Sequence, residues 1–318
     1  MDPGAVEIFV TGATGVLGRP VLRMLREEGH AVRGLARSRS NVELLRRLGV
    51  EPVRADLFSG GGIADAVAGV DAVLHLATKV PPRSQATRPE AWAENVRIRV
   101  EGTKTLVDAA LAAGVKTFLY PSLAFVYEDG GDRWIDAETA RADPATGIAA
   151  TLTAEAEVER FAAGGGRGIV LRMGYFYGPE AESTLDTLAM ARRRTAFLTG
   201  PSDAYYPAIW VDDAATAVIA ALRDAASGIY DVVDDEPLTR RELAKAIAEA
   251  AGRSFVLRPP VWLVKLVGGR EADFMVRSHR VSNARFKIAT GWAPAVRDAR
   301  EGWRLIGDAL HQPQHDPA

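Results

Sequence analysis

A glycine-rich segment near the N-terminus has the residue types and spacing to hold a phosphate ligand. The segment Thr11 to Gly18 follows a β-branched run, Val6 to Val10, and precedes a helix-like run, Arg19 to Glu28. Glycines at such a strand–helix turn let the backbone approach a pyrophosphate and let the helix pack closely on the strand. Free N–H groups at the start of the helix would face the phosphates. The segment therefore predicts a dinucleotide site formed by Gly12, Thr14, Gly15, Val16, Leu17 and Gly18.

The residues after the next two expected strands bear on which dinucleotide binds. The second strand, Ala31 to Ala36, leads into Arg37 without the Asp or Glu that NAD sites usually place about 20 residues after the glycines. The Arg37 guanidinium would suit the 2′-phosphate of NADP, although it could instead be a solvated residue at a strand end. Asp56, after the third strand, is placed to accept from the adenine amino group or to cap the next turn. The pattern favours NADP.

Strand-like and helix-like segments alternate along the first 230 residues. Further strands are expected at Ala72 to Leu76, Lys116 to Tyr120, Gly168 to Arg172 and Gly228 to Val233. Helices are expected at Asn41 to Leu48, Ile63 to Val67, Glu90 to Ala113, Ala145 to Ala163 and Val211 to Leu222. Such alternation indicates a parallel sheet covered on both faces, which binds dinucleotides at the carboxyl ends of its strands. We therefore expect an α/β fold with a Rossmann-type doubly wound parallel sheet.

The composition of the chain limits the kinds of partner that it can be expected to bind. The 318 residues include 39 Lys and Arg against 41 Asp and Glu, a net charge of −2, so no basic surface for nucleic acid is indicated. The absence of Cys excludes thiolate chemistry and Cys-ligated metals, and no metal site is expected. No apolar run is long enough to span a membrane, and no signal-like segment opens the chain, so the simplest expectation is a soluble cytoplasmic protein.

These features together resemble the extended short-chain dehydrogenase/reductase family, also described as NAD-dependent epimerase/dehydratases. The resemblance rests on the glycine segment and on six later motifs, which are Asp56-Leu57, His75-Leu76-Ala77-Thr78, Asn95 with Glu101-Gly102-Thr103, Pro121 to Tyr127, Leu171 to Pro179 and Trp210 to Ala215. It implies a Rossmann domain, residues 1–178 and 208–234, with a smaller and mostly C-terminal substrate lobe, residues 179–207 and 235–312, and a tail, 313–318. It also implies that the cofactor contacts Leu57, Leu76, Ala77, Thr78, Met173 and Tyr175.

The chain departs from this family at the catalytic centre. Members usually carry a Ser or Thr and a Tyr-x-x-x-Lys pair, in which the ammonium lowers the tyrosine pKa so that the phenol can exchange a proton with the substrate. Here no Tyr occurs from 128 to 174 and no Lys from 117 to 244. Ser122 is the nearest match to the Ser/Thr position, although aligning Val126-Tyr127 with the family's usual Val-Tyr places Leu123 there. Tyr127 and Lys79 are candidates to move the proton. Alternatively, Tyr127 is an ordinary packed tyrosine and Lys79 is a solvated lysine.

Three functions remain open at this point. The first is an NADP-dependent oxidoreductase or epimerase/dehydratase that acts on a carbonyl or hydroxyl of a small molecule, a sugar nucleotide or a secondary metabolite. In it Ser122 would orient the oxygen, and Tyr127 or Lys79 would handle the proton. The second is a non-redox enzyme on the same fold, for a cyclisation, isomerisation or elimination. The third is an NADP-binding regulatory protein without turnover. A small-molecule substrate is the expected partner, and a homodimer is left open.

Overall fold

The computed structural model describes residues 4–311, apart from 83–84, 86–87, 144–147 and 269–274. Its centre is a seven-stranded sheet in which every neighbouring pair of strands is parallel. The strands are β1 (Glu7–Thr11), β2 (Ala31–Leu35), β3 (Glu51–Val53), β4 (Ala72–His75), β5 (Thr117–Leu123), β7 (Arg167–Met173) and β11 (Gly228–Val232). Their order is β3-β2-β1-β4-β5-β7-β11. The predicted doubly wound α/β fold is confirmed.

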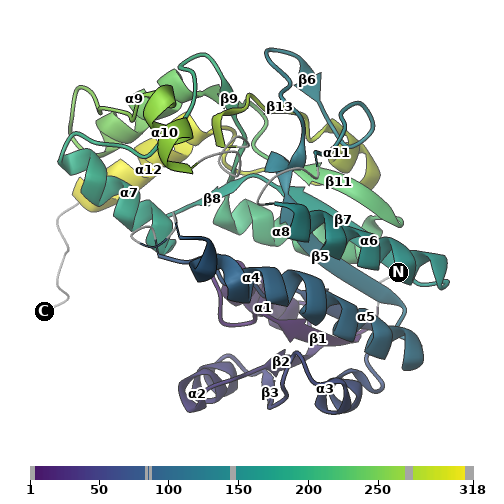
Figure 1. Ribbon diagram of the computed structural model, residues 1–318. Coiled ribbons are helices and arrows are strands. Elements are labelled where there is room, and N and C mark those ends of the chain that lie inside the picture. The colour runs from purple at the N-terminus through teal and green to yellow at the C-terminus, as the bar shows by residue number, and fades with distance from the viewer. Residues whose placement is uncertain (1–3, 83–84, 86–87, 144–147, 269–274, 312–318) are drawn as a thin grey trace, which may run out of the picture.

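Helices cover both faces of this sheet (Figure 1). Because side chains alternate along a strand, Ile8 and Val10 of β1 enter one apolar core, and Phe9 enters the other. The first core receives side chains from α1 (Gly18–Glu27), α2 (Arg39–Arg47), α8 (Val211–Asp224) and α11 (Ala284–Thr290). The second receives them from α3 (Gly60–Val67), α5 (Thr103–Ala112) and α6 (Ala149–Ala163). The beginning predicted for α6, Ala145 to Gly147, lies outside the described residues.

The long helix expected at 90–113 is interrupted. It consists of a 3₁₀ turn η2 (Pro89–Trp92), α4 (Ala93–Arg97), a π-helical turn η3 (Ile98–Gly102) and then α5. π-helical turns are rare and occur frequently at functional sites. Gly102 ends this turn beside Leu57, since a Cβ there would lie 2.8 Å from the Leu57 Cδ2, and Leu57 would have to shift to make room for it. The wide turn therefore packs against the loop after β3.

A smaller lobe packs beyond the carboxyl ends of the strands (Figure 1). Its helices are α7 (Glu182–Arg192), α9 (Arg240–Ala250), α10 (Val261–Gly268) and α12 (Ala299–His311), and its strands β9 (Tyr205–Tyr206) and β12 (Leu238–Thr239) pair antiparallel. Thr239 and Glu242 form a capping box at the start of α9. Two further pairs are parallel, β8 (Tyr175–Tyr177) with β10 (Ala208–Trp210) and β6 (Trp134–Ile135) with β13 (Arg280–Val281).

One segment of the range expected for the lobe, residues 235–312, lies elsewhere. Helix α11 packs on α8 and β11, and Phe286 and Trp292 belong to a core of the large sheet. The division at 235 remains a prediction. It assigns residues 284–292 to the lobe, whereas in the structure they pack on the sheet domain. The expected tail, 313–318, lies outside the described residues. Among the helices of the described chain, none has the length and apolar character to cross a membrane.

Candidate active site

The glycine segment forms a tight loop between β1 and α1. Gly12 has φ +70, and a Cβ on it would lie 2.4 Å from the carbonyl carbon of Leu76. A Cβ on Gly18 would lie 2.2 Å from the carbonyl oxygen of Gly12, so only glycine fits at either position. Gly15 is exposed at the tip, where its N–H bonds the Gly12 carbonyl at 3.0 Å. The backbone is therefore open for a ligand beside the first turn of α1.

The start of α1 is suited to an anion. Leu17 precedes the helix without any side-chain cap, and the first turn contains no acidic residue. The first N–H groups of a helix have no partner within it and carry partial positive charge. Thr14 and Val16 are half-buried beside the exposed Gly15. In α1 the Arg19 N–H bonds the Gly15 carbonyl at 3.1 Å and Pro20 has no N–H, so the features that fit the pyrophosphate of a dinucleotide are the glycine loop and the positive end of the helix.

Arg37 and Asp56 both lie at strand ends, as expected, but each already has a partner. The Asp56 Oδ1 accepts from the backbone N–H of Phe58 at 3.1 Å, which is the turn-capping role that the sequence left open for it. Arg37 is exposed and donates through Nη1 to Glu94 Oε1 at 2.7 Å. Leu57, next to Asp56, is buried against Gly102. The structure thus adds Glu94, a residue that the sequence did not single out.

A buried polar network lies behind the loop after β4. Asn95 donates to the Thr78 hydroxyl at 2.8 Å and accepts from Arg99 Nε at 3.0 Å. Arg99, which is 8% exposed, also donates to the Tyr120 hydroxyl. His75 adjoins the network, with its ring 5.8 Å from that of Tyr120. Arg99 and Tyr120 were missed from the sequence because the π-helical turn that brings Arg99 inward has no recognisable sequence signal.

His75 is held as a neutral, structural side chain. Its Nδ1 lies 2.6 Å from the Thr11 hydroxyl, and the ring is fully buried. Burial lowers the pKa of His75 to about 3, so the imidazole is uncharged at neutral pH. This fits the position of Thr11 and His75 at the adjoining ends of β1 and β4.

Ser122 is hydrogen-bonded to a buried ion pair, which Glu155 forms with Arg172. It donates to the Glu155 carboxylate of α6, which also accepts from Arg172 Nε at 3.0 Å and from Arg172 Nη2 at 2.7 Å. Ser122 is 2% exposed. Helix α6 itself contains neither Tyr nor Lys. Ser122 therefore links β5 to α6 and β7, and this geometry does not support the expected role of orienting a substrate oxygen.

Tyr127 points away from the solvent as well. Its ring is fully buried, its hydroxyl donates to Asp231 Oδ1 at 2.6 Å, and the Arg172 guanidinium lies 4.8 Å from the ring centroid. Burial, followed by the charge of Asp231, raises the pKa of Tyr127 above its ordinary value. A phenol that is buried, bonded to a carboxylate and harder to ionise is a poor proton carrier. The structure therefore does not support Tyr127 as the proton donor.

Met173 and Tyr175 follow the carboxyl end of β7. Met173 is 1% exposed, whereas Tyr175 is half-buried. The Tyr175 ring lies 5.8 Å from that of Tyr206 in the lobe, which in turn lies 5.1 Å from that of Phe125, just after β5. Three aromatic rings thus meet where the strand ends face the lobe, and all three are partly exposed.

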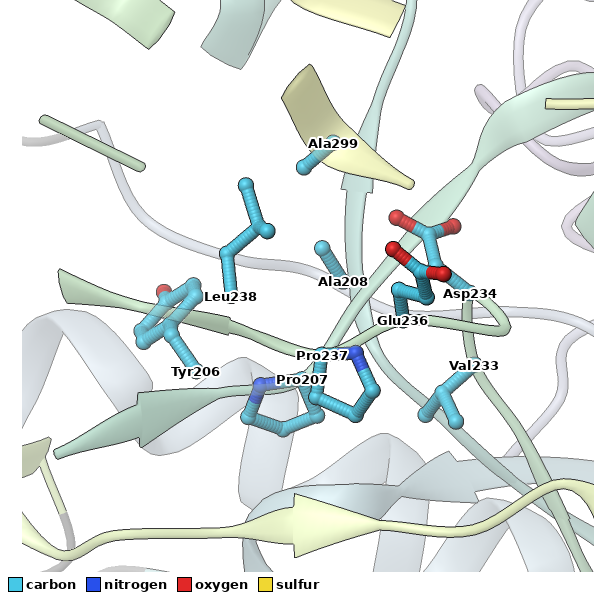
Figure 2. A pocket seen from close by; sticks show the side chains of 9 residues that line it. All are labelled: Tyr206, Pro207, Ala208, Val233, Asp234, Glu236, Pro237, Leu238 and Ala299. Carbon is cyan, nitrogen blue, oxygen red and sulfur yellow. The ribbon is translucent and has the colours of Figure 1, made fainter. Parts of the chain in front are cut away.

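Tyr206 of this cluster also lines a small hollow, whose lining residues Figure 2 shows. It lies between the lobe residues Leu238 and Ala299 and the sheet domain, and the Asp234 and Glu236 carboxylates are adjacent in it. Burial raises the pKa of Asp234 well above its ordinary value, and Asp234 accepts from the Tyr177 hydroxyl at 2.9 Å. This pocket is smaller than ordinary ligand sites. A second hollow, of about 600 Å³, is lined by Trp134, Asp235, Glu236, Ser282, Asn283, Ala284, Lys287, Ile288 and Arg297, with no residue of the glycine loop.

Comparison with known proteins decides the family. A family model described as the NAD dependent epimerase/dehydratase family matches residues 8–233. The chain belongs to this family. A 3-diazoavenalumate denitrifying reductase from a Streptomyces species is 32% identical over 311 residues, which are 93% of this chain and 99% of that protein.

Two further proteins are similar to this chain at lower identity. A 2-alkyl-3-oxoalkanoate reductase from Stenotrophomonas maltophilia is 30% identical over 265 residues, covering 78% of this chain and 76% of that one. The structure of a human epimerase family protein with NADPH superposes with a TM-score of 0.76 at 20% identity, covering 95% of this chain and 99% of that chain. The chain is therefore a reductase-like member of the epimerase/dehydratase family, and its glycine loop fits a nicotinamide cofactor.

Proposed function

We propose that this protein is an NADPH-dependent reductase whose substrate accepts hydride without a proton from the enzyme, as an aryl diazonium ion does. An aryl diazonium ion that receives one hydride becomes an arene and releases N₂, and the nicotinamide becomes oxidised. No proton is consumed, so atoms and charge balance without an acid. The name of the Streptomyces relative, a denitrifying reductase of a diazo compound, supports this class of reaction.

The proposal rests on one observation: both hydroxyl groups that were expected to act in catalysis, those of Ser122 and Tyr127, donate hydrogen bonds to carboxylates instead. Ser122 donates to Glu155 and Tyr127 donates to Asp231, both inside the protein. Reduction of a carbonyl leaves an alkoxide that must be protonated, and the family's pair for that task is absent from α6. Displacement of N₂ by hydride has no such requirement. A site that retains the cofactor loop and lacks the proton relay is suited to that chemistry.

The remaining residues then have roles in binding and positioning. Gly12, Gly15 and the first turn of α1 would hold the pyrophosphate, and Arg37 would hold the 2′-phosphate that distinguishes NADPH. When bound, NADPH would supply the hydride. The rings of Phe125, Tyr175 and Tyr206 would stack on or edge against an aryl substrate, the arrangement that aromatic pairs prefer.

A second candidate is a carbonyl reductase in which Tyr175 supplies the proton. Tyr175 is half-buried at the start of β8, just after β7, and the family resemblance implies that it contacts the cofactor. The similarity to the 2-alkyl-3-oxoalkanoate reductase supports this alternative. The two candidates differ in whether catalysis requires the Tyr175 hydroxyl.

The test offers the purified protein two probes, 4-carboxybenzenediazonium and 3-oxooctanoate, with NADPH deuterated at either face of C4. We expect deuterium at the ring carbon that carried nitrogen, from one face only, in both the wild type and Tyr175→Phe. Heat-denatured protein controls for direct reduction of the probe. Stereospecific deuteration of 3-oxooctanoate that disappears in Tyr175→Phe, with no enzymatic labelling of the arene, would establish the second candidate instead.

A further inference from the structure

Two paired segments of the lobe direct large apolar side chains toward the solvent. Thr195, just after α7, forms a parallel bridge with Leu257, and the Ala196 N–H bonds the Leu257 carbonyl at 2.9 Å. Because side chains alternate along an extended chain, Phe197 and Phe255 are expected on the same side of this pairing as Leu257. All three are exposed, whereas Ala196 is buried. The outer side of the paired segments is therefore apolar.

Helix α10 follows these segments directly in the chain and adds to their apolar surface. It begins four residues after Leu257, and Trp262, Leu263 and Leu266 are exposed on it, the first by 67% and the last by 74%. Spacings of three and four residues place these side chains on one face of a helix. Together with the three side chains of the paired segments they form an apolar patch. Exposed apolar surface of this extent indicates an interaction site.

Cations predominate in the segments that form this patch. Residues 187–202 and 250–270 together contain six Arg, one Lys and no Asp or Glu. Four of the arginines are exposed and have no ion pair within the described part of the chain, namely Arg192, Arg193, Arg194 and Arg253. The overall net charge of −2 therefore conceals a local concentration of positive charge.

These arginines lie beside the apolar side chains. The Arg194 guanidinium is 5.1 Å from the centroid of the Phe255 ring, and Arg253 Nε donates to the Arg192 carbonyl at 3.0 Å. Exposed Trp and Leu bordered by arginine are typical of segments that lie in the interface of a lipid bilayer. A symmetric dimer through the same patch would bring the arginines of two copies together, where they repel each other. The charge therefore favours an anionic lipid surface over a second copy of the chain.

We propose that the apolar patch and its arginines bind the surface of a membrane that contains anionic phospholipids. Trp262, Leu263 and Leu266 enter the boundary between head groups and acyl chains, and the arginines contact the lipid phosphates. Helix α10 has eight residues, so it lies on the membrane and does not cross it. The proposal departs from the sequence-based expectation of a soluble cytoplasmic protein, and it is independent of the proposed reductase activity.

The test measures sedimentation of the purified protein with vesicles of phosphatidylcholine, with or without phosphatidylglycerol. We expect binding to the anionic vesicles, much weaker binding to the neutral ones, and release at high salt. Trp262→Gln with Leu266→Gln should lower the affinity about tenfold or more, because it removes the apolar side chains that the lipid would bury. The matched control is Ile288→Gln on α11, which changes a still more exposed apolar residue outside the patch.

A second pair of variants tests the positive charge. Arg192→Gln with Arg193→Gln should lower the affinity for anionic vesicles about twentyfold, since each arginine at such a surface contributes about fivefold. The control is Arg46→Gln with Arg47→Gln, the same change at the last turn of α2. The replaced side chains are exposed, so the melting temperature of each variant should be close to that of the wild type.

Lipids brominated along the acyl chain separate insertion from contact with head groups alone. Their quenching of tryptophan fluorescence should be lost in Trp262→Phe and kept in Trp134→Phe, although Trp134 is exposed as well. Absence of binding to anionic vesicles, or equal binding of the patch variants and their controls, overturns the proposal. A dimer in sedimentation that Trp262→Gln with Leu266→Gln abolishes, without vesicle binding, would assign the patch to a second copy of the chain instead.

Discussion

Tyr127 and Asp231 are joined by a 2.6 Å hydrogen bond inside the protein, between the segment after β5 and strand β11. The second carboxylate oxygen of Asp231 accepts from the backbone N–H of Ala137 at 2.9 Å. Through Asp231, Tyr127 therefore connects the segment after β5 and strand β11 with the loop that contains Ala137. The bond gives a structural role to Tyr127, one of the two residues that the sequence offers as proton donors.

Replacing Tyr127 with Phe should therefore affect stability and spare turnover. The variant leaves one oxygen of a buried carboxylate without its donor, which costs about 1–3 kcal/mol. Urea unfolding followed by circular dichroism measures the loss, and NADPH oxidation with the best substrate measures turnover. A kcat lowered more than tenfold at unchanged unfolding midpoint would return Tyr127 to the catalytic machinery.

Asp231 should make stability depend on pH. Burial raises the pKa of Asp231 to about 7, above its ordinary value of 3.8. Between these two values the folded protein binds more protons than the unfolded chain, so the contribution of Asp231 to stability falls as pH rises from about 4 to 7. Asp231→Asn cannot titrate, and its amide can accept from Ala137 and donate to Tyr127. The wild type should lose on the order of a few kcal/mol relative to this variant across that range. The test measures the unfolding midpoints of the wild type and of Asp231→Asn at four pH values. If the two midpoints change in parallel with pH, the prediction is contradicted.

Of the carboxylates on α6, Glu155 should cause the largest loss of folding stability when it is neutralised. Glu155→Gln leaves the Arg172 guanidinium buried without its counter-ion, a change that costs about 3–5 kcal/mol. The control on the same helix is Glu157→Gln, whose partner Arg160 is 42% exposed, and its cost should stay below about 1 kcal/mol. Chemical unfolding of both variants provides the comparison, and equal losses would show that burial of the pair is unimportant.

Ser122→Ala is a milder probe of the same site. It removes one donor to Glu155 and should cost about 1–2 kcal/mol. Because Ser122 is tied into the interior, we expect KM and kcat to remain within twofold of the wild type. A large fall in kcat without loss of stability would mean that Ser122 reaches the substrate during turnover.

Two glycines of the loop should respond differently to alanine. Gly12→Ala combines a left-handed φ of +70 with a Cβ 2.4 Å from the carbonyl carbon of Leu76, so it should disrupt the loop and lower the melting temperature. At Gly15 the nearest atom to a Cβ is the Gly12 carbonyl oxygen, at 3.1 Å, and the position is exposed. Gly15→Ala should fold with a melting temperature within a few degrees of the wild type and bind NADPH more weakly. NADPH fluorescence and thermal unfolding check both, and a fully active Gly12→Ala would contradict the loop geometry.

The parts of the site that follow from local sequence were predictable. Gly18 is required by contacts within one strand–turn–helix unit, and that unit is visible in the sequence. Gly12 has the left-handed φ of the same turn, but the contact that excludes a side chain there comes from Leu76, after β4. The hydrogen-bond partner of Ser122 was not predictable, because it is a carboxylate 33 residues later in the chain. The same holds for Tyr127, whose partner is 104 residues away.

The π-helical turn at Ile98–Gly102 has a consequence for how this chain tolerates length changes. A regular α-helix advances about 100° per residue, so removing one residue within the turn would rotate everything before it by about that angle relative to α5. Asn95 and Glu94 would both leave their present partners, Thr78 and Arg37. A single-residue deletion here would produce a more regular helix and a less complete site. The irregular turn thus sets the register between helix α5 and the loops after β2 and β4, which are expected to meet the cofactor.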